Sequence, residues 1–194
     1  FEDATLAILN EDSTEPTTSG QTIYRLVDSV EFKGDLWGLF DGKQDSDNAG
    51  QVYARKYTGS STTWTGGGGV ASDQDTNPLQ ALDIAVVGDA LVALVLGSSD
   101  SSDERDYVRA RYSADGASWS TPSTQMGGQT GTNATAGGDT QDGKLVAIGG
   151  DIYGIINEAD VGQIRIWKSA NEGVAWTQQS AVLSGDRVNG ATAY

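Results

Sequence analysis

The chain has 194 residues, a length that fits one domain, and its hydrophobic content of 37% is compatible with a packed core. It contains neither cysteine nor histidine, which excludes disulfides, thiolate nucleophiles, Ser-His-Asp triads and the usual zinc ligands. The net charge of −15, from 27 acidic and 12 basic residues, argues against a nucleic-acid partner, because phosphate binding needs a concentrated basic surface.

Charge and apolar patterning also set an expectation for location. An acidic, lysine-poor surface suits a secreted or surface-exposed protein, and it equally suits a high-salt habitat, where salt screens self-repulsion. The apolar run 90–96 has the length of a buried strand and is too short to cross a bilayer. We therefore expect an extracellular or surface-exposed protein, secreted or carried on a virion, without membrane insertion.

The chain begins with a short apolar stretch at 4–9, which predicts an N-terminal strand, followed by a polar linker up to residue 20. Beyond it, three alternating segments predict strands at 51–57, 106–112 and 163–168. Each is followed by a related turn sequence that ends in tryptophan: TGSSTTW at Trp64, SADGASW at Trp119 and SANEGVAW at Trp176. This internal repeat indicates three copies of one structural unit.

An apolar run opened by a turn signal precedes each alternating segment, at 34–40, 88–94 and 143–148. We expect these runs to be the buried second strand of each unit, with hairpin turns at Gly34-Asp35, Gly88-Asp89 and Asp142-Gly143. Each unit then contains four antiparallel strands, which is the composition of a β-propeller blade. The sequence therefore predicts an all-β propeller over 21–194, with blades at about 21–75, 76–130 and 131–188 and the first strand of a fourth at 189–194.

The turn sequences predict a structural role. In SADGASW, the side chains of Ser113 and Asp115 can satisfy backbone donors within the turn, Gly116 relieves backbone strain, and Trp119 packs its ring beneath the hairpin. The same role is expected at the matching positions of the other two turns, which are Thr58, Trp64, Ser169, Asn171, Gly173 and Trp176.

SADGASW resembles the Asp-box, or BNR repeat, of the sialidases, and the order of segments over 21–194 resembles the N-terminal half of a six-bladed sialidase domain. In this resemblance, the stretch Tyr24-Arg25-Leu26-Val27 lies where the family carries an Arg-Ile-Pro motif. The resemblance implies that Arg25 grips a sugar carboxylate, that Lys43 is a second basic residue of the binding site, and that Asp47 is the acid/base residue with Asp45 as its nearest competitor. The family's nucleophilic tyrosine and its supporting glutamate belong to a second half that this chain does not match.

Structural alternatives stand beside each of these assignments. Arg25 can form an ordinary strand ion pair, and Asp47 can be a solvated loop acid. The loop at 45–50 resembles part of a calcium site, but Lys56 stands where an EF-hand needs its bidentate glutamate. We expect no cofactor and no metal, with Ca²⁺ at this loop as the one open alternative.

Three functions follow from this sequence. The first is a glycan-recognising, sialidase-like propeller module that is non-catalytic as this chain, with a glycan or sialoglycoconjugate as its partner. The second is the N-terminal part of an active exo-sialidase, and the third is a structural or adhesive appendage of a virion or cell surface. Three blades do not close a ring, so we expect completion by the remaining blades of a longer chain or by homo-oligomerisation.

Overall fold

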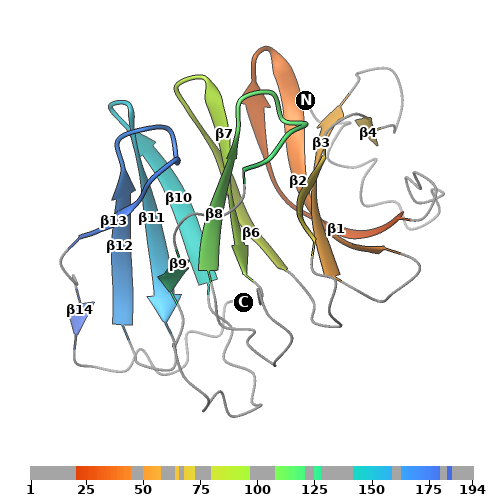
Figure 1. Cartoon of the computed structure of the whole chain (residues 1–194). Coiled ribbons are helices and arrows are strands. Elements are labelled where there is room, and N and C mark those ends of the chain that lie inside the picture. Colours follow the sequence, from red (N-terminus) through yellow and green to blue (C-terminus); the bar gives the residue numbers. More distant parts are fainter. Residues whose placement is uncertain are drawn as a thin grey trace, which may run out of the picture.

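In the residues that the computed structural model describes, the regular elements are all β-strands, and these form three antiparallel sheets that stand side by side (Figure 1). The all-β prediction is therefore confirmed. Among the described residues, no helix is long and apolar enough to cross a membrane. The structure describes residues 21–44, 50–57, 64–65, 68–72, 80–96, 108–120, 125–127, 142–158, 163–179 and 183–184.

Each sheet takes its strands in chain order. The first sheet contains β1 (Gln21–Phe32), β2 (Asp35–Gln44), β3 (Gly50–Tyr57), β4 (Trp64–Thr65) and β5 (Gly69–Ser72). The second sheet contains β6 (Gln80–Val87), β7 (Ala90–Leu96), β8 (Val108–Ser113) and β9 (Gln125–Gly127). The third sheet contains β10 (Asp142–Ile148), β11 (Asp151–Glu158), β12 (Gln163–Ser169), β13 (Thr177–Gln178) and β14 (Leu183–Ser184).

The first two strands of every sheet form a tight hairpin whose turn requires left-handed backbone. Lys33 (φ 53°) and Gly34 (φ 80°) form the first turn, and Gly149 (φ 61°) and Gly150 (φ 90°) form the third. Positive φ at both central residues matches the right-handed twist of the flanking strands. In the second hairpin, Gly88 supplies positive φ (56°).

The prediction for the third unit was wrong in its strand order. The apolar run 143–148 is the first strand, β10, rather than the second, and β11 follows it. Asp142-Gly143 opens β10 instead of forming a turn. The physical reason is that Gly149 and Gly150 directly follow the run and supply both left-handed positions of the hairpin.

The prediction of four strands per unit holds in the second sheet alone. In the other two sheets the last strand is split into two short pieces, because β4 and β5 both pair with β3, and β13 and β14 both pair with β12. Gly69 begins β5, and the carbonyl oxygen of the preceding Gly68 accepts a hydrogen bond from the Ala54 amide (3.2 Å).

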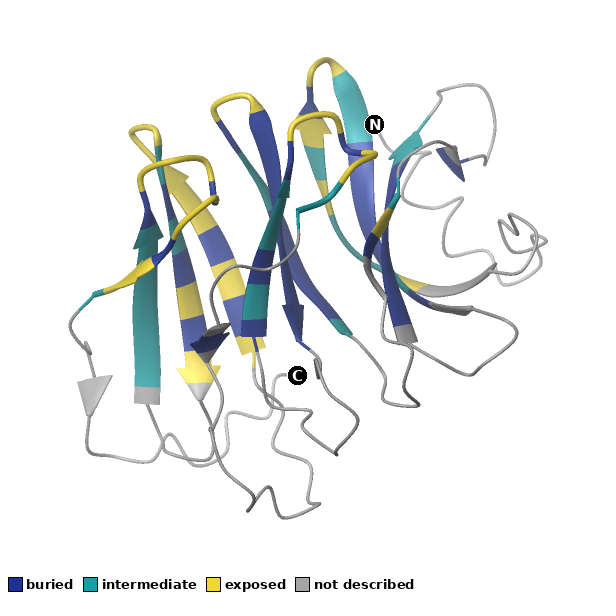
Figure 2. Cartoon of the chain, in the orientation of Figure 1, coloured by how far each residue is buried: buried dark blue, intermediate teal, exposed yellow. Residues whose placement is uncertain are grey.

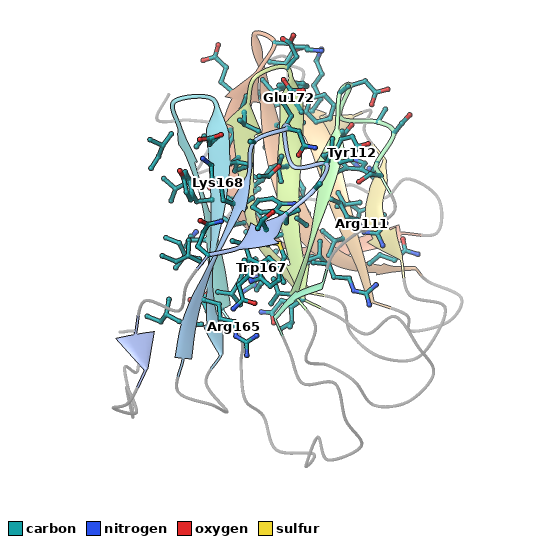
Figure 3. The ribbon with its side chains drawn as sticks, turned by 60° about the vertical axis from the view of Figure 1, so that its left-hand side comes forward. Arg111, Tyr112, Arg165, Trp167, Lys168 and Glu172 are labelled. Atoms are coloured by element: carbon teal, nitrogen blue, oxygen red, sulfur yellow. The ribbon has the colours of Figure 1, made fainter. Side chains whose placement is uncertain are left out.

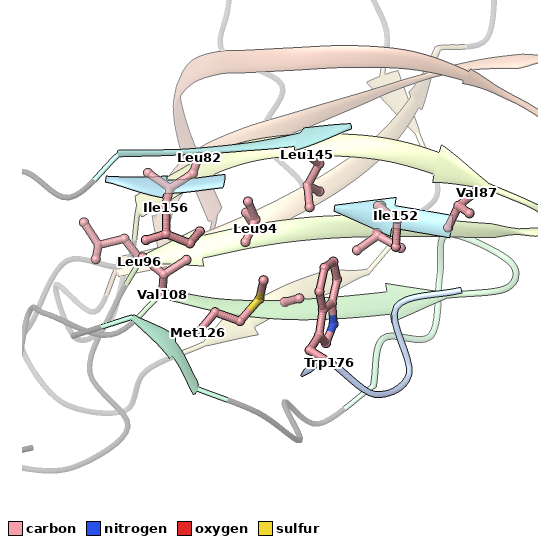
Figure 4. Close-up of a cluster of buried hydrophobic side chains, with 12 residues drawn as sticks. Leu82, Val87, Leu94, Leu96, Val108, Met126, Leu145, Ile152, Ile156 and Trp176 are labelled. Atoms are coloured by element: carbon pink, nitrogen blue, oxygen red, sulfur yellow. The ribbon is translucent and has the colours of Figure 1, made fainter. Parts of the chain in front are cut away.

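Two apolar cores lie between the three sheets. Strand β7 is buried along its whole length because its side chains alternate between them: Leu91, Ala93 and Val95 pack toward the first sheet, and Val92, Leu94 and Leu96 pack toward the third. This two-sided burial explains why the run Ala90–Leu96 has no polar residue. Figure 4 shows the core between the second and third sheets, where Met126 and Trp176 close the outer side.

The outer faces of the end sheets differ. On the first sheet, the face turned away from the second carries Phe40, Tyr53 and Trp64, which are all buried. On the third sheet, exposed residues alternate with buried ones along β10 and β11 (Figure 2). One end of the stack therefore has a closed face and the other an open one.

Candidate functional site

The first strands of the three sheets lie next to one another, since β6 contacts both β1 and β10. These strands carry a row of ionisable side chains at matching positions. Asp28, Asp83 and Lys144 precede the last residue of their strands by the same interval (28 to 32, 83 to 87, 144 to 148). The repeat therefore places three chemically active groups in one row.

A β-bulge precedes each of the two carboxylates in this row. The strand register shifts between Leu26 and Asp28 in β1, and again between Ala81 and Asp83 in β6. A bulge adds a residue on one strand and re-aims the side chain that follows it. Strand β10 carries Lys144 at the equivalent position, and it pairs with β11 without a β-bulge.

Asp83 is the centre of the row and is only 3% exposed. Its Oδ2 atom accepts a hydrogen bond from the Leu145 amide (2.6 Å), and its Oδ1 atom accepts one from Nζ of Lys144 (2.9 Å). Burial raises the pKa of Asp83, and a hydrogen bond with the Asp28 carboxyl raises this pKa further. The carboxyl group of Asp28 therefore adjoins that of Asp83 in this row, and this proximity disfavours the charged form of Asp83.

Lys144 forms an ion pair with Asp83. The hydrogen bond to Asp83 is the largest cause that raises the pKa of Lys144, which the nearby carboxylates of Asp28 and Asp142 raise further. The Lys144 side chain is 62% exposed, whereas the Asp83 side chain is 4% exposed. Solvent and ligands therefore reach this group of residues through the ammonium rather than through the buried acid.

Arg25, the predicted carboxylate-binding residue, lies on β1 directly opposite Asp41 of β2. Its Nε and Nη2 atoms donate to Oδ2 of Asp41 (3.0 and 2.6 Å). The other oxygen of Asp41, Oδ1, accepts the Ala81 amide of the second sheet (2.5 Å). The Arg25 side chain remains 54% exposed, and within the described residues its Nη1 atom donates no hydrogen bond.

The other predicted binding residues are only partly placed. The backbone of Lys43 lies in β2, opposite Thr22 and Gly50. Asp45, Asp47 and Thr58 lie outside the described residues, as do the segments 1–20 and 189–194. Among the residues that the structure describes, no group of three or more acidic side chains is arranged to hold a metal ion; the loop considered for Ca²⁺ lies almost entirely outside them.

The second turn has the local hydrogen bonds that its sequence predicts. The Ser113 hydroxyl oxygen accepts the amides of Asp115 and Gly116 (3.3 and 2.7 Å), and Oδ1 of Asp115 accepts those of Ala117 and Ser118 (2.8 Å each). Gly116 has φ 74°, and Trp119 donates from its indole nitrogen to the Gly116 carbonyl (3.0 Å). The amides of Ser118 and Ala117 lower the pKa of Asp115 to about 2.

The third turn repeats this arrangement with asparagine in place of aspartate. The Ser169 hydroxyl accepts the Gly173 amide (3.0 Å), Oδ1 of Asn171 accepts the Ala175 amide (2.9 Å), and the Trp176 indole donates to the Gly173 carbonyl (2.9 Å). In the first turn, Trp64 instead packs against Phe40 and Tyr57 of its own sheet.

These turns also join neighbouring sheets. Lys33, in the first hairpin, donates from Nζ to the Ala114 carbonyl in the turn of the second sheet (2.8 Å). In the same way, the Asp89 amide in the second hairpin donates to Oε1 of Glu172 in the turn of the third sheet (3.3 Å); Figure 3 labels Glu172. The turns are therefore structural parts that lock each sheet to the one before it.

Sequence reasoning missed four residues of this region: Asp28, Asp41, Asp83 and Lys144. The observed turns at 33–34, 88–89 and 149–150 align Asp28, Asp83 and Lys144 at one position. The sequence analysis placed the first turn one residue too late, at Gly34-Asp35, and misassigned the third hairpin, so the match was hidden. In comparisons with known proteins, no family model and no curated protein matched the sequence.

Proposed function

We propose that this chain is a glycan-recognising module built as part of a sialidase-like β-propeller, surface-exposed and non-catalytic as this chain. Three antiparallel sheets that stand side by side with adjacent first strands support the propeller, in which these strands would line the central axis. Further blades of a longer chain or another copy would complete the ring.

One observation carries the binding proposal. Arg25 lies on the first strand, Asp41 fixes one side of its guanidinium, and the side chain is still half exposed. A guanidinium held in this way is preorganised to donate paired hydrogen bonds to a planar carboxylate such as that of a sialic acid. Lys144, on the first strand of the third sheet, is another exposed donor suited to sugar hydroxyls.

Calorimetry with sialyl-lactose and with lactose tests this proposal. We expect the sialylated sugar to bind in preference to lactose and Arg25→Ala to abolish the difference. The matched control is Lys168→Ala. Like Arg25→Ala, it removes an ion pair between neighbouring strands, but this pair joins Lys168 to Asp151 on the third sheet; Figure 3 labels Lys168. Equal binding of both sugars, or binding that Arg25→Ala leaves unchanged, would refute the assignment, and turnover of a fluorogenic sialoside would refute the non-catalytic assignment.

A scaffold role is the second candidate, and a different observation favours it. Asp41 and Asp83 each accept a backbone amide from the next sheet, at Ala81 and Leu145. Carboxylates used in this way hold sheets together rather than contact a ligand. Absence of binding to either sugar would support this scaffold function.

A further inference from the structure

A β-bulge in β1 brings Arg25 and Asp28 onto one face of the first sheet. These residues are three apart in the chain, but their partners on β2, Asp41 and Leu39, are only two apart, because the register shifts between Leu26 and Asp28. Side chains two positions apart on a strand point to the same face. The bulge therefore makes a guanidinium and a carboxyl group neighbours on one face, with their positions about 7 Å apart along the strand.

This face of the first sheet is turned toward the second sheet. Leu39, which lies opposite Asp28, belongs to the core between the two sheets. The Asp41 carboxylate that holds Arg25 also accepts a backbone amide of β6, and the carboxyl group of Asp28 forms a hydrogen bond with that of Asp83 in β6. Arg25 and Asp28 therefore both lie beside the first strand of the second sheet.

Both side chains can be reached by a ligand. The Arg25 side chain is 54% exposed and Asp28 is partly exposed, whereas the side chain of Asp83 is 4% exposed. Oδ1 of Asp28 accepts the amide of Ser29 (2.7 Å). Because an ionised carboxylate has about four acceptor positions, Asp28 keeps the capacity to accept hydrogen bonds from a ligand.

The charges around these two residues favour a ligand that carries both signs. The charge of Arg25 is already paired with Asp41 (2.6 Å), and that of Lys144 is paired with Asp83 (2.9 Å). Within the described part of the chain, Asp28 forms no salt bridge with a lysine or an arginine. In a chain with a net charge of −15, a ligand that adds an ammonium group beside Asp28 gains more than one that offers a carboxylate alone.

We infer that Asp28 is a specificity-determining residue that binds a protonated amine, so that the ligand is an amino-sugar acid with its carboxylate on Arg25 and its ammonium on Asp28. The inference rests on the proposed function, because Arg25 must hold the carboxylate. Hydrogen bonds between an ammonium and a carboxylate are roughly twice as strong as those between neutral groups. An N-acetylated sugar offers a neutral amide at the same place and loses this advantage.

Calorimetry with two sugars tests this inference: the methyl glycoside of neuraminic acid, which has a free amine, and that of N-acetylneuraminic acid. We expect the wild type to bind the free amine about tenfold more tightly. Asp28→Asn should bind both sugars equally, with the wild-type affinity for the N-acetylated one, and Arg25→Ala should weaken both. The matched control is Glu31→Gln, which removes an exposed carboxylate from the opposite face of β1, where Glu31 pairs with Leu36, and should keep the preference.

The ratio of the two dissociation constants separates recognition from a structural role of Asp28. A loss of its bond with Asp83 alone would weaken both sugars alike and leave this ratio unchanged, and thermal melts establish that each variant is folded. Equal binding of both sugars by the wild type, or a preference that survives Asp28→Asn, would overturn the inference and leave the proposed function standing as long as Arg25→Ala weakens both. Binding that Arg25→Ala leaves unchanged would count against the proposed function, and a wild type that binds neither sugar would overturn both.

Discussion

Gly116 in the turn of the second sheet lies against the indole of Trp37 in the first sheet, so that a Cβ atom at Gly116 would come within 2.3 Å of the ring carbon Cη2. The next pair of sheets repeats this contact between Gly173 and Val92, at 2.8 Å. Trp37 and Val92 occupy the same position of their strands (35 to 37, 90 to 92). The glycine of each turn is therefore needed for its φ angle and for the close approach of the neighbouring sheet.

Replacing Gly116 by alanine should destabilise the protein more than replacing Gly34. Both glycines have positive φ (74° and 80°), so each alanine carries a left-handed strain of about 1–2 kcal/mol. Only the alanine at Gly116 also meets the Trp37 ring, since nothing lies within 4 Å of a Cβ at Gly34. Urea unfolding measures the loss of stability in both variants. Equal losses would mean that the close approach of Trp37 to position 116 does not add to the destabilisation.

Asp115 should make the free energy of unfolding depend on pH in the acidic range. Its pKa is lowered to about 2 in the folded chain from an ordinary value of 3.8. A lowered pKa contributes stability above the unfolded value, and this contribution is lost as the pH falls from about 4 to about 2. Asp115→Asn should remove this acid-dependent loss and keep the turn, because Asn171 makes the corresponding bonds in the third sheet.

Urea midpoints at pH 6 and pH 2.5 for the wild type, Asp115→Asn and Asp115→Ala measure this effect. The alanine variant should be less stable than the asparagine variant at both pH values, since it leaves the amides of Ala117 and Ser118 without their acceptor. An asparagine variant with the same acid loss as the wild type would contradict the assignment.

Asp83 should have the opposite pH dependence. Burial and Asp28 raise its pKa, so it contributes stability below the unfolded value of about 4, and that contribution is lost as the pH rises through the folded pKa. Asp83→Asn should flatten this part of the stability curve, while keeping an oxygen for the Leu145 amide. The neighbouring charges are Asp28, Lys144 and Asp142.

A leucine at position 83 separates the hydrogen bond from the charge. Asp83→Leu leaves the buried Leu145 amide without an acceptor, a loss of about 1–3 kcal/mol. The control is Asp151→Asn, which removes the half-buried partner of Lys168 on the third sheet and should change stability by less than about 1 kcal/mol. A leucine variant as stable as this control would show that the Leu145 amide finds another partner.

The two turn tryptophans should differ in their effect on stability. Trp176 is 7% exposed and belongs to the core between the second and third sheets, whereas Trp119 is partly buried at the edge of the core between the first and second. Trp176→Ala should therefore cost about 3–5 kcal/mol, the range for a buried aromatic, and Trp119→Ala less. Thermal unfolding followed by calorimetry ranks the two, and the reverse order would contradict the assigned packing.

Much of the architecture could be predicted from the sequence because it depends on local residue patterns. Alternation predicted β3, β8 and β12 to within two residues, and the turn sequence predicted that the side chains of Ser113 and Asp115 accept backbone amides. The bond from the Trp119 indole to the Gly116 carbonyl was not predicted. The error at β10 arose because an Asp-Gly pair signals a turn only when both flanking strands exist. A second glycine pair at 149–150 competed for the same hairpin.

The candidate site was less predictable because its contacts join different sheets. The sequence indicates an ion pair of Arg25 as one alternative, but its partner Asp41 is defined by strand register rather than by sequence spacing. Asp83 depends on a bulge in β6 and on the position of Lys144 in the next sheet, neither of which a single-sequence pattern specifies. The assignment of Asp47 and Asp45 stays a prediction.

The second sheet is the one packed against a neighbour on both faces, and this has a consequence for how the molecule opens. Where each unit contacts only the unit beside it, cooperativity decays along the array and the ends fray first. Backbone amides of β7 should therefore be the slowest to exchange with deuterium. Those of β10 and β11, whose sheet is covered on one side, should exchange earlier.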